Sequence, residues 1–199
     1  MRSALPREPP LCASCREALL PAEETPVGVR AAFLHGGPIA AAIHRAKYGG
    51  DPSVARGLGA LLRDLIPEGD VVIAPIPLHR NRLCSRGFNQ SAVLAAGAGR
   101  SRVGVDLLAR LRDTPSQTSL DRDHRRANLD GAFTVERPAR VRGRLVVVVD
   151  DVVTTGATMR AAMDALREAG AAETLGVALA SAALRHARPR GRASSVSGW

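Results

Sequence analysis

The fold is decided by the stretch Val146–Thr158, VVVVDDVVTTGAT. Four consecutive valines, Val146–Val149, are typical of a strand that is buried on both faces, as in a parallel sheet. Asp150 and Asp151 follow, and then a Thr- and Gly-rich turn leads into an apolar helical pattern. The stretch therefore predicts a strand, a loop at the carboxyl edge of a sheet, and a helix.

The side chains of this loop are suited to binding a sugar phosphate. Thr154, Thr155 and Thr158 offer hydroxyl donors, and Gly156 lets backbone amides approach a phosphate closely. Two adjacent carboxylates suit a polyol or a hydrated Mg²⁺ ion. The alternative, a buried strand with solvated acids and an ordinary helix cap, leaves the two acids before the TTG turn unexplained. Together these residues predict a ribose 5-phosphate cradle.

The rest of the chain alternates strand and helix patterns, which predicts an α/β fold with a mostly parallel sheet flanked by helices. Neither GxxxxGK[ST] nor GxGxxG follows a strand, so other nucleotide-binding loops fit less well. We expect two helices joined by a turn within 38–65, a helix over 90–98, and a helix over 159–169 ending at Gly170. The expected strands are 71–76, 131–135, 145–149 and 175–180; 103–111 suits strand or helix, 79–88 a loop and 113–130 a long polar loop.

Composition favours one globular domain that handles anions. The chain has 199 residues, 45% hydrophobic and 24% charged, with a net charge of +9. No apolar run reaches the roughly 18 residues that span a bilayer, so we expect a cytoplasmic protein, with peripheral membrane association left open. Phosphorylated molecules or nucleic acid suit the charge. Because aromatic residues are only 3%, nucleic-acid binding would be mainly electrostatic.

The 13 residues of Val146–Thr158 resemble the phosphoribosyl-pyrophosphate (PRPP) motif of type I phosphoribosyltransferases. Further segments resemble the ComF/GntX family of competence-associated, phosphoribosyltransferase-like proteins. Those segments are LCASCREAL, HRAKYGGD, APIPLHRNRLCSRGFNQ and RLRDTPSQTSLDRDHRRANLDGAF, which with the motif span most of 11–179. The resemblance implies a type I phosphoribosyltransferase-like fold, PRPP with Mg²⁺ as ligand, and a role in DNA uptake beside competence helicase machinery.

The resemblance also implies roles for particular residues. Asp150 and Asp151 would hold the ribose hydroxyls and could act as acid or base. Val153 and the residues Thr154, Thr155, Gly156, Ala157 and Thr158 would hold the 5-phosphate. His79 and Arg80 would approach the pyrophosphate. Lid or accessory roles fall to Lys47, Arg86, Gln90, Gln117, Arg125 and Asn128.

Three of these assignments have plain structural alternatives. For Gln117, Arg125 and Asn128 the alternative is a solvated charged loop without a lid function. Lys47, the sole lysine of the chain, could be an ordinary cation at a helix end. The run Arg86–Gln90 could be a helix start with Asn89 as its cap.

Cys12 and Cys15 resemble the second half of the family's amino-terminal zinc finger. Two thiolates are half of a tetrahedral zinc site, and Cys84 lies far along the chain. We therefore expect a degenerate knuckle or a truncated start rather than a stable zinc site. The expected organisation is a segment 1–30 with the CxxC, a phosphoribosyltransferase-like domain 31–184 and a basic disordered tail 185–199.

The functional expectation is a PRPP-binding phosphoribosyltransferase, with catalysis favoured and the acceptor open. The alternative is a catalytically silent accessory protein that binds single-stranded DNA, or a PRPP-sensing regulator. Catalysis requires the acid pair and Thr155, whereas DNA binding depends on arginine clusters and weakens with salt.

Overall fold

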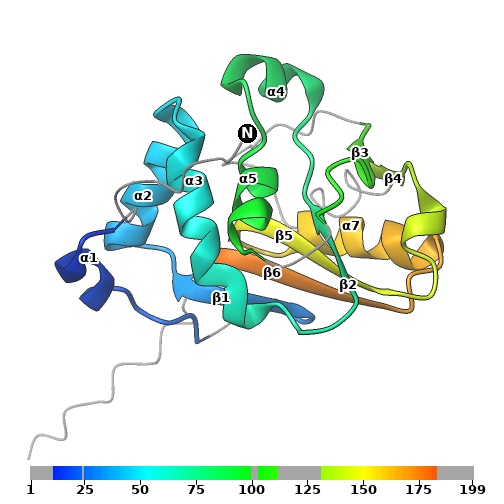
Figure 1. Cartoon of the computed structure of the whole chain (residues 1–199), viewed down its shortest axis with the longest axis horizontal. Helices are drawn as coiled ribbons and strands as arrows, with labels where there is room; N and C mark the ends of the chain where they lie inside the picture. The colour runs from blue at the N-terminus through cyan, green and yellow to red at the C-terminus, as the bar shows by residue number, and fades with distance from the viewer. Residues whose placement is uncertain (1–10, 24, 100–102, 112–130, 183–199) are drawn as a thin grey trace, which may run out of the picture.

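A four-stranded parallel sheet forms the centre of the computed structural model, which describes residues 11–23, 25–99, 103–111 and 131–182. The strand order is β1-β6-β5-β2, and all three neighbouring pairs are parallel (Figure 1). The bounds are β1 Val29–Leu34, β2 Val71–Pro75, β5 Leu145–Val153 and β6 Glu173–Ser181. A separate two-stranded antiparallel sheet pairs β3 (Leu108–Arg110) with β4 (Phe133–Val135).

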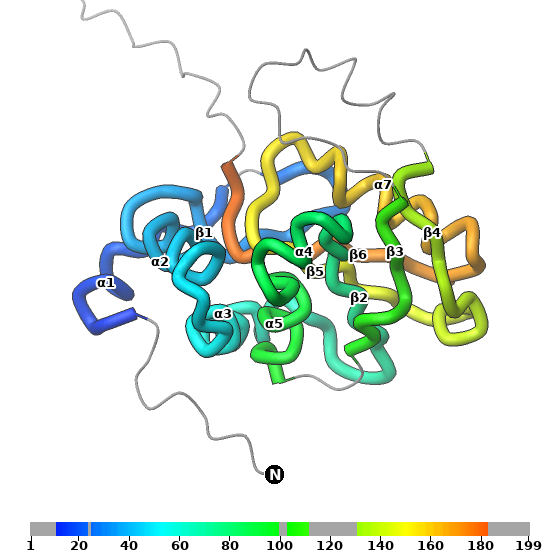
Figure 2. Tube along the Cα trace, turned by 90° about the horizontal axis from the view of Figure 1, so that it is seen from above, coloured from blue at the N-terminus to red at the C-terminus, as the bar shows by residue number. Residues whose placement is uncertain are grey.

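Helices lie on both faces of the parallel sheet. Seen from above, α3 and α5 lie on one side of the strands and α7 on the other (Figure 2). The helices are α1 Ala13–Glu17, α2 Gly37–Tyr48, α3 Pro52–Gly59, α4 Arg80–Arg86, α5 Gln90–Gly97 and α7 Ala157–Glu168, with 3₁₀ turns η1 Ala60–Leu65 and η2 Pro138–Arg140.

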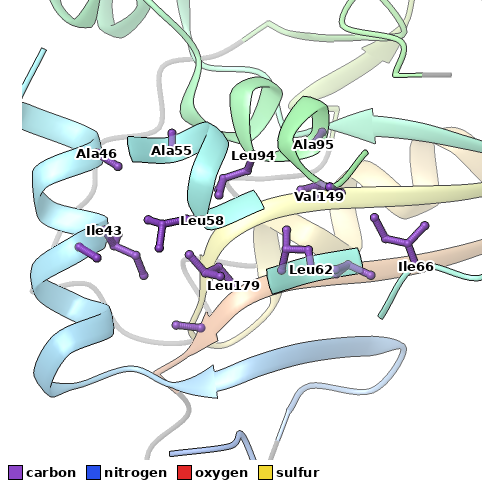
Figure 3. Close-up of a cluster of buried hydrophobic side chains, with 14 of the residues drawn as sticks. Ile43, Ala46, Ala55, Leu58, Leu62, Ile66, Leu94, Ala95, Val149 and Leu179 are labelled. Carbon is purple, nitrogen blue, oxygen red and sulfur yellow. The ribbon is translucent and has the colours of Figure 1, made fainter. Parts of the chain in front are cut away.

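The valine run of β5 supplies both halves of the core, because successive strand residues point to opposite faces. Val147 and Val149 pack with residues of α2, α3 and α5, whereas Val146 and Val148 pack with residues of α7. Figure 3 shows the first half, where Leu58, Leu94 and Leu179 meet Val149. All four valines are fully buried. The sequence prediction of a strand buried on both faces is confirmed.

Most of the predicted elements are present with shifted ends. The two helices within 38–65 are α2 and α3, continued by η1, and the turn between them includes Gly49 and Gly50. The predicted strands 71–76, 131–135, 145–149 and 175–180 correspond to β2, β4, β5 and β6. Within 103–111, which suited strand or helix, the structure has the strand β3 and a parallel bridge from Val103 to Ile73. The residues 113–130 and 185–199 lie outside the described part of the chain.

The predicted loop over 79–88 was wrong, because α4 occupies Arg80–Arg86. His79 caps its first turn through Nδ1, which accepts from the Asn81 amide at 3.4 Å. Gly87 ends the helix in the left-handed conformation, with φ 78°. These two caps stabilise a short helix. None of its residues is buried, so its sequence has no periodic apolar pattern that would predict it.

Strand β1 was not anticipated by the sequence pattern. It begins at Val29 and pairs with β6, so the sheet takes in residues on both sides of the expected domain boundary at residue 30. Within the described residues, no helix is both long enough and apolar enough to cross a membrane.

Candidate functional site

The acid pair lies at the carboxyl edge of the parallel sheet, inside β5 rather than after it. The strand continues to Val153, and Asp150 is in register with Ala178 of β6. The neighbouring strand β2 ends beside it, since Pro75 pairs with Val149 and the Ile76 amide donates to Val149 O at 2.9 Å. The segments that follow β2 and β5 therefore leave the sheet side by side.

The carboxyl group of Asp150 accepts two hydrogen bonds, and its pKa is raised. Ser91 Oγ donates to Asp150 Oδ1 at 2.8 Å, and the Asp151 amide donates to the same oxygen at 2.9 Å. Burial, together with the neighbouring charge of Asp151, raises the Asp150 pKa from 3.8 to about 6, although Ser91 and Lys47 act in the opposite direction. This carboxyl can thus hold or release a proton near neutral pH.

Asp151 forms an ion pair with Lys47. Lys47 Nζ lies 2.9 Å from Asp151 Oδ1, and the two side chains are 23% and 13% exposed. The lysine is in the last turn of α2, where a cation also complements the helix dipole. The structure thus brings the sole lysine of the chain to the predicted site, a pairing that the helix-end interpretation does not require.

The Thr-rich turn joins β5 to the N-terminus of α7. Gly156 precedes the helix with φ 75°, and a Cβ there would lie 2.7 Å from Pro26 Cβ. Thr155 Oγ1 accepts from the Ala157 amide at 3.4 Å. Gly156 has no side chain to cap the helix, so the first-turn amides after that of Ala157 are suited to an anion. Thr154 is exposed, whereas the Val153 side chain is 4% exposed and belongs to the core.

On the β2 side of the edge, His79 is the N-cap of α4 and Arg80 is its exposed first residue. Asn89 caps α5 by accepting from the Ser91 amide at 3.1 Å, as the capping alternative predicted, and its Nδ2 donates to Ile76 O at 2.9 Å. Asn89 thereby fixes the start of α5 against the end of β2. Sequence reasoning did not single out Ser91; its place two residues after a helix-capping Asn was the available signal.

Arg86 and Gln90 form a second polar pair beside the acids. Arg86 Nη1 donates to Gln90 Oε1 at 3.1 Å, and Arg86 Cζ lies 5.3 Å from the Tyr48 ring centre. Gln90 is only 2% exposed, and its Nε2 has no hydrogen-bond partner among the described residues. Gln90 and Asp151 line one small pocket with the apolar side chains of Ile43, Ala46, Ala55, Leu58, Leu94 and Leu179.

The structure does not join the cysteines into one cluster. Cys12 is the N-cap of α1, Cys15 lies within that helix and Cys84 lies in α4. A hydrogen bond shared with Ser14 lowers the Cys12 pKa to about 7, and the Cys12 neighbour raises that of Cys15. Across residues 11–23, 25–99, 103–111 and 131–182, no three His, Cys, Asp or Glu side chains gather as a metal site. Gln117, Arg125 and Asn128 lie outside these ranges.

Comparison with known proteins agrees with this geometry. Residues 102–196 match the family model of the phosphoribosyl transferase domain. The DNA utilization protein YhgH of Escherichia coli K12 is 34% identical over 146 residues, covering 68% of this chain and 63% of that protein. Competence protein F of Haemophilus influenzae is 32% identical over 151 residues (68% and 65%), and competence protein ComFC of Streptococcus pneumoniae is 29% identical over 164 (81% and 72%).

The parallel sheet, its flanking helices and the domain match together define a type I phosphoribosyltransferase-like α/β protein. With relatives of these names at 29 to 34% identity, the chain belongs to the ComF family. It spans 63% of the length of the YhgH protein that it matches.

Proposed function

We propose that this protein binds PRPP with Mg²⁺ at the carboxyl edge of β5 and acts as a phosphoribosyltransferase in DNA uptake. The observation that carries this proposal is the continuity of the site. Asp150 and Asp151 directly follow the four fully buried valines of β5, and after Val153 a glycine turn leads to the N-terminus of α7. A diol-binding group and a phosphate-binding group thus lie on one short stretch of backbone.

The 5-phosphate would bind at the turn. First-turn amides of a helix point along its axis and carry partial positive charge, which favours a bound phosphate. Thr154 is exposed and Thr155 and Thr158 are half-buried, so their hydroxyls can add donors. Gly156 keeps this turn tight, because its left-handed backbone and its packing against Pro26 leave no room for a side chain.

The ribose hydroxyls would bind the acid pair. Asp151 is 13% exposed and can exchange its Lys47 partner for a ligand hydroxyl, which leaves the ammonium group to meet ligand phosphate. The carboxylate oxygens of this pair and the phosphates of PRPP are ligands that Mg²⁺ prefers. When bound, Mg²⁺ would offset the charge of the departing pyrophosphate.

The pyrophosphate would face the segment after β2, where His79 and Arg80 lie. This segment leaves the sheet beside Asp150, because Ile76 bonds to Val149. In the transfer, the bond from ribose C1 to pyrophosphate breaks and a bond from C1 to the acceptor forms. Asp150, with its pKa near 6, could take the proton that the acceptor releases.

A place in DNA uptake is supported by the names of the relatives, which are competence and DNA utilization proteins. Binding of single-stranded DNA, contact with competence helicase machinery and a cytoplasmic location belong to this proposal. A silent accessory protein or a PRPP sensor would keep the ligand site without turnover.

Calorimetric titration with PRPP and Mg²⁺ tests the proposal. Asp151→Asn should weaken binding about tenfold or more, because a charged hydrogen-bond acceptor is lost. Asp164→Asn is the matched control, since Asp164 lies on α7 and pairs with Arg167 at the surface. Absence of binding by the wild-type chain would refute the proposed ligand. Pyrophosphate release with nucleobases or single-stranded DNA then separates an enzyme from a sensor.

A further inference from the structure

Tyr48 exposes its aromatic ring, in contrast to the phenylalanine rings of the described part of the chain. It is the last residue of α2 and is 64% exposed. The other described aromatic side chains, Phe33, Phe88 and Phe133, are half-buried or buried. An exposed ring forgoes the hydrophobic stabilisation that burial gives, so its surroundings show whether it has another use.

The surroundings hold the ring in place. Arg86 lies over it at 5.3 Å, and the His44 ring is 4.7 Å away at an interplanar angle of 47°. Arg86 is itself fixed by Gln90, which is 2% exposed at the start of α5. The ring is therefore tied to the core through a chain of contacts while most of its surface is open to solvent.

The ring belongs to the residue that follows a direct contact of the acid pair in the sequence. Lys47, the residue before it, contacts Asp151 at 2.9 Å. Arg86, which lies over the Tyr48 ring, donates a hydrogen bond to Gln90. Gln90 lines the same pocket as Asp151. A planar base that is joined to, or approaches, a ribose held by Asp150 and Asp151 would find an aromatic face within reach of that sugar.

We propose that Tyr48 and Arg86 form a stacking platform for a nucleobase beside the ribose site. The inference deepens the proposed function and rests on it for the position of the ribose. A tyrosine ring stacks on any base, and an arginine adds a cation that favours both the π-face and nearby phosphate. The base can be free or part of a single strand, because both present the same planar face.

Binding of a fluorescein-labelled oligothymidylate, compared with an abasic strand of equal length and charge, tests the platform by fluorescence anisotropy. Wild type should bind the oligothymidylate about tenfold more tightly, since only this strand carries bases that can stack on the ring. Tyr48→Leu should remove this preference and Tyr48→Phe should keep it. Val105→Ala, at another exposed apolar residue, should leave it unchanged.

Free adenine as a competitor separates the two sources of the base. Displacement of the oligothymidylate supports a platform that accepts a free base, and Tyr48-dependent binding without displacement supports a base within a strand. Equal preference in wild type and Tyr48→Leu would overturn the proposal, as would a wild type that binds both strands alike.

PRPP titration of the same variants keeps the two proposals distinct. Tyr48→Leu should bind PRPP as wild type does. If this variant lost PRPP binding as well as the preference for the oligothymidylate, the platform would be overturned, because the ring would then support the ribose site. A wild type that does not bind PRPP yet shows Tyr48-dependent strand preference would refute the proposed function and support the platform.

Discussion

Lys47 Nζ and Asp151 Oδ1 lie 2.9 Å apart, which joins the end of α2 to the carboxyl edge of β5. The contact places the chain's sole lysine against the second acid of the Val146–Thr158 stretch. A partly buried ion pair of this kind sets the charge balance of the two acids before any ligand arrives.

Replacement of Lys47 by Met should weaken PRPP binding about tenfold, because a cation that can meet the ligand phosphates is lost. Lys47→Arg should retain part of the affinity. Calorimetry measures both, and Arg45→Met, which removes an exposed cation from the same helix, is the control. Equal losses in Lys47→Met and Arg45→Met would mean that general charge alone is responsible.

The raised pKa of Asp150 predicts a pH-dependent stability. The folded-state pKa of about 6 exceeds the ordinary value of 3.8, so the folded protein binds the proton more tightly than the unfolded chain. The free energy of unfolding contributed by this group is therefore greatest below pH 4 and declines as the pH rises to about 6. Asp150→Asn should flatten this slope and raise stability at pH 7.5, on the order of 1 kcal/mol. Urea unfolding across this range measures it, and an unchanged slope would contradict the prediction.

Ser91→Ala should raise the pKa of Asp150 further, because the Ser91 hydroxyl donates to the charged carboxylate at 2.8 Å. NMR titration of the carboxyl carbon follows this shift. Stability above pH 7 should fall by about 1 kcal/mol through the lost hydrogen bond. Ser85→Ala on α4, where an exposed serine bonds its own helix, should change neither quantity.

Gly156→Ala should destabilise the turn before α7 and weaken PRPP binding. The substitution gives a residue with φ 75° a side chain, which strains the backbone. The new Cβ would also lie 2.7 Å from Pro26 Cβ, so steric overlap adds to this strain. Gly143→Ala isolates the strain, because Gly143 has φ 69° with no atom near its Cβ position. We expect Gly156→Ala to cost about 1–2 kcal/mol more than the control. Similar unfolding midpoints for the two variants would show that Pro26 shifts to accommodate the added Cβ.

The sequence determined the elements whose evidence is local. Val146–Val149 predicted a doubly buried strand because four β-branched apolar residues leave no polar face, and the acids and threonines after it predicted a phosphate-binding turn. The helices α2, α3 and α5 followed from apolar periodicity. The caps of α4 were present in the sequence as His79 and Gly87, but a short helix without a buried face gives no periodic pattern, so a loop was predicted.

Only the tertiary structure decided which distant side chains meet the motif. Ser91 reaches Asp150 from 59 positions earlier in the chain, and Lys47 reaches Asp151 from another helix, because α2 and α5 pack on the same face of the sheet. Strand β1 is likewise defined by its pairing with β6 rather than by its own composition. Local sequence specifies backbone conformation and hydrophobic pattern, whereas the partners, burial and pKa of a carboxylate depend on packing between segments far apart in the chain.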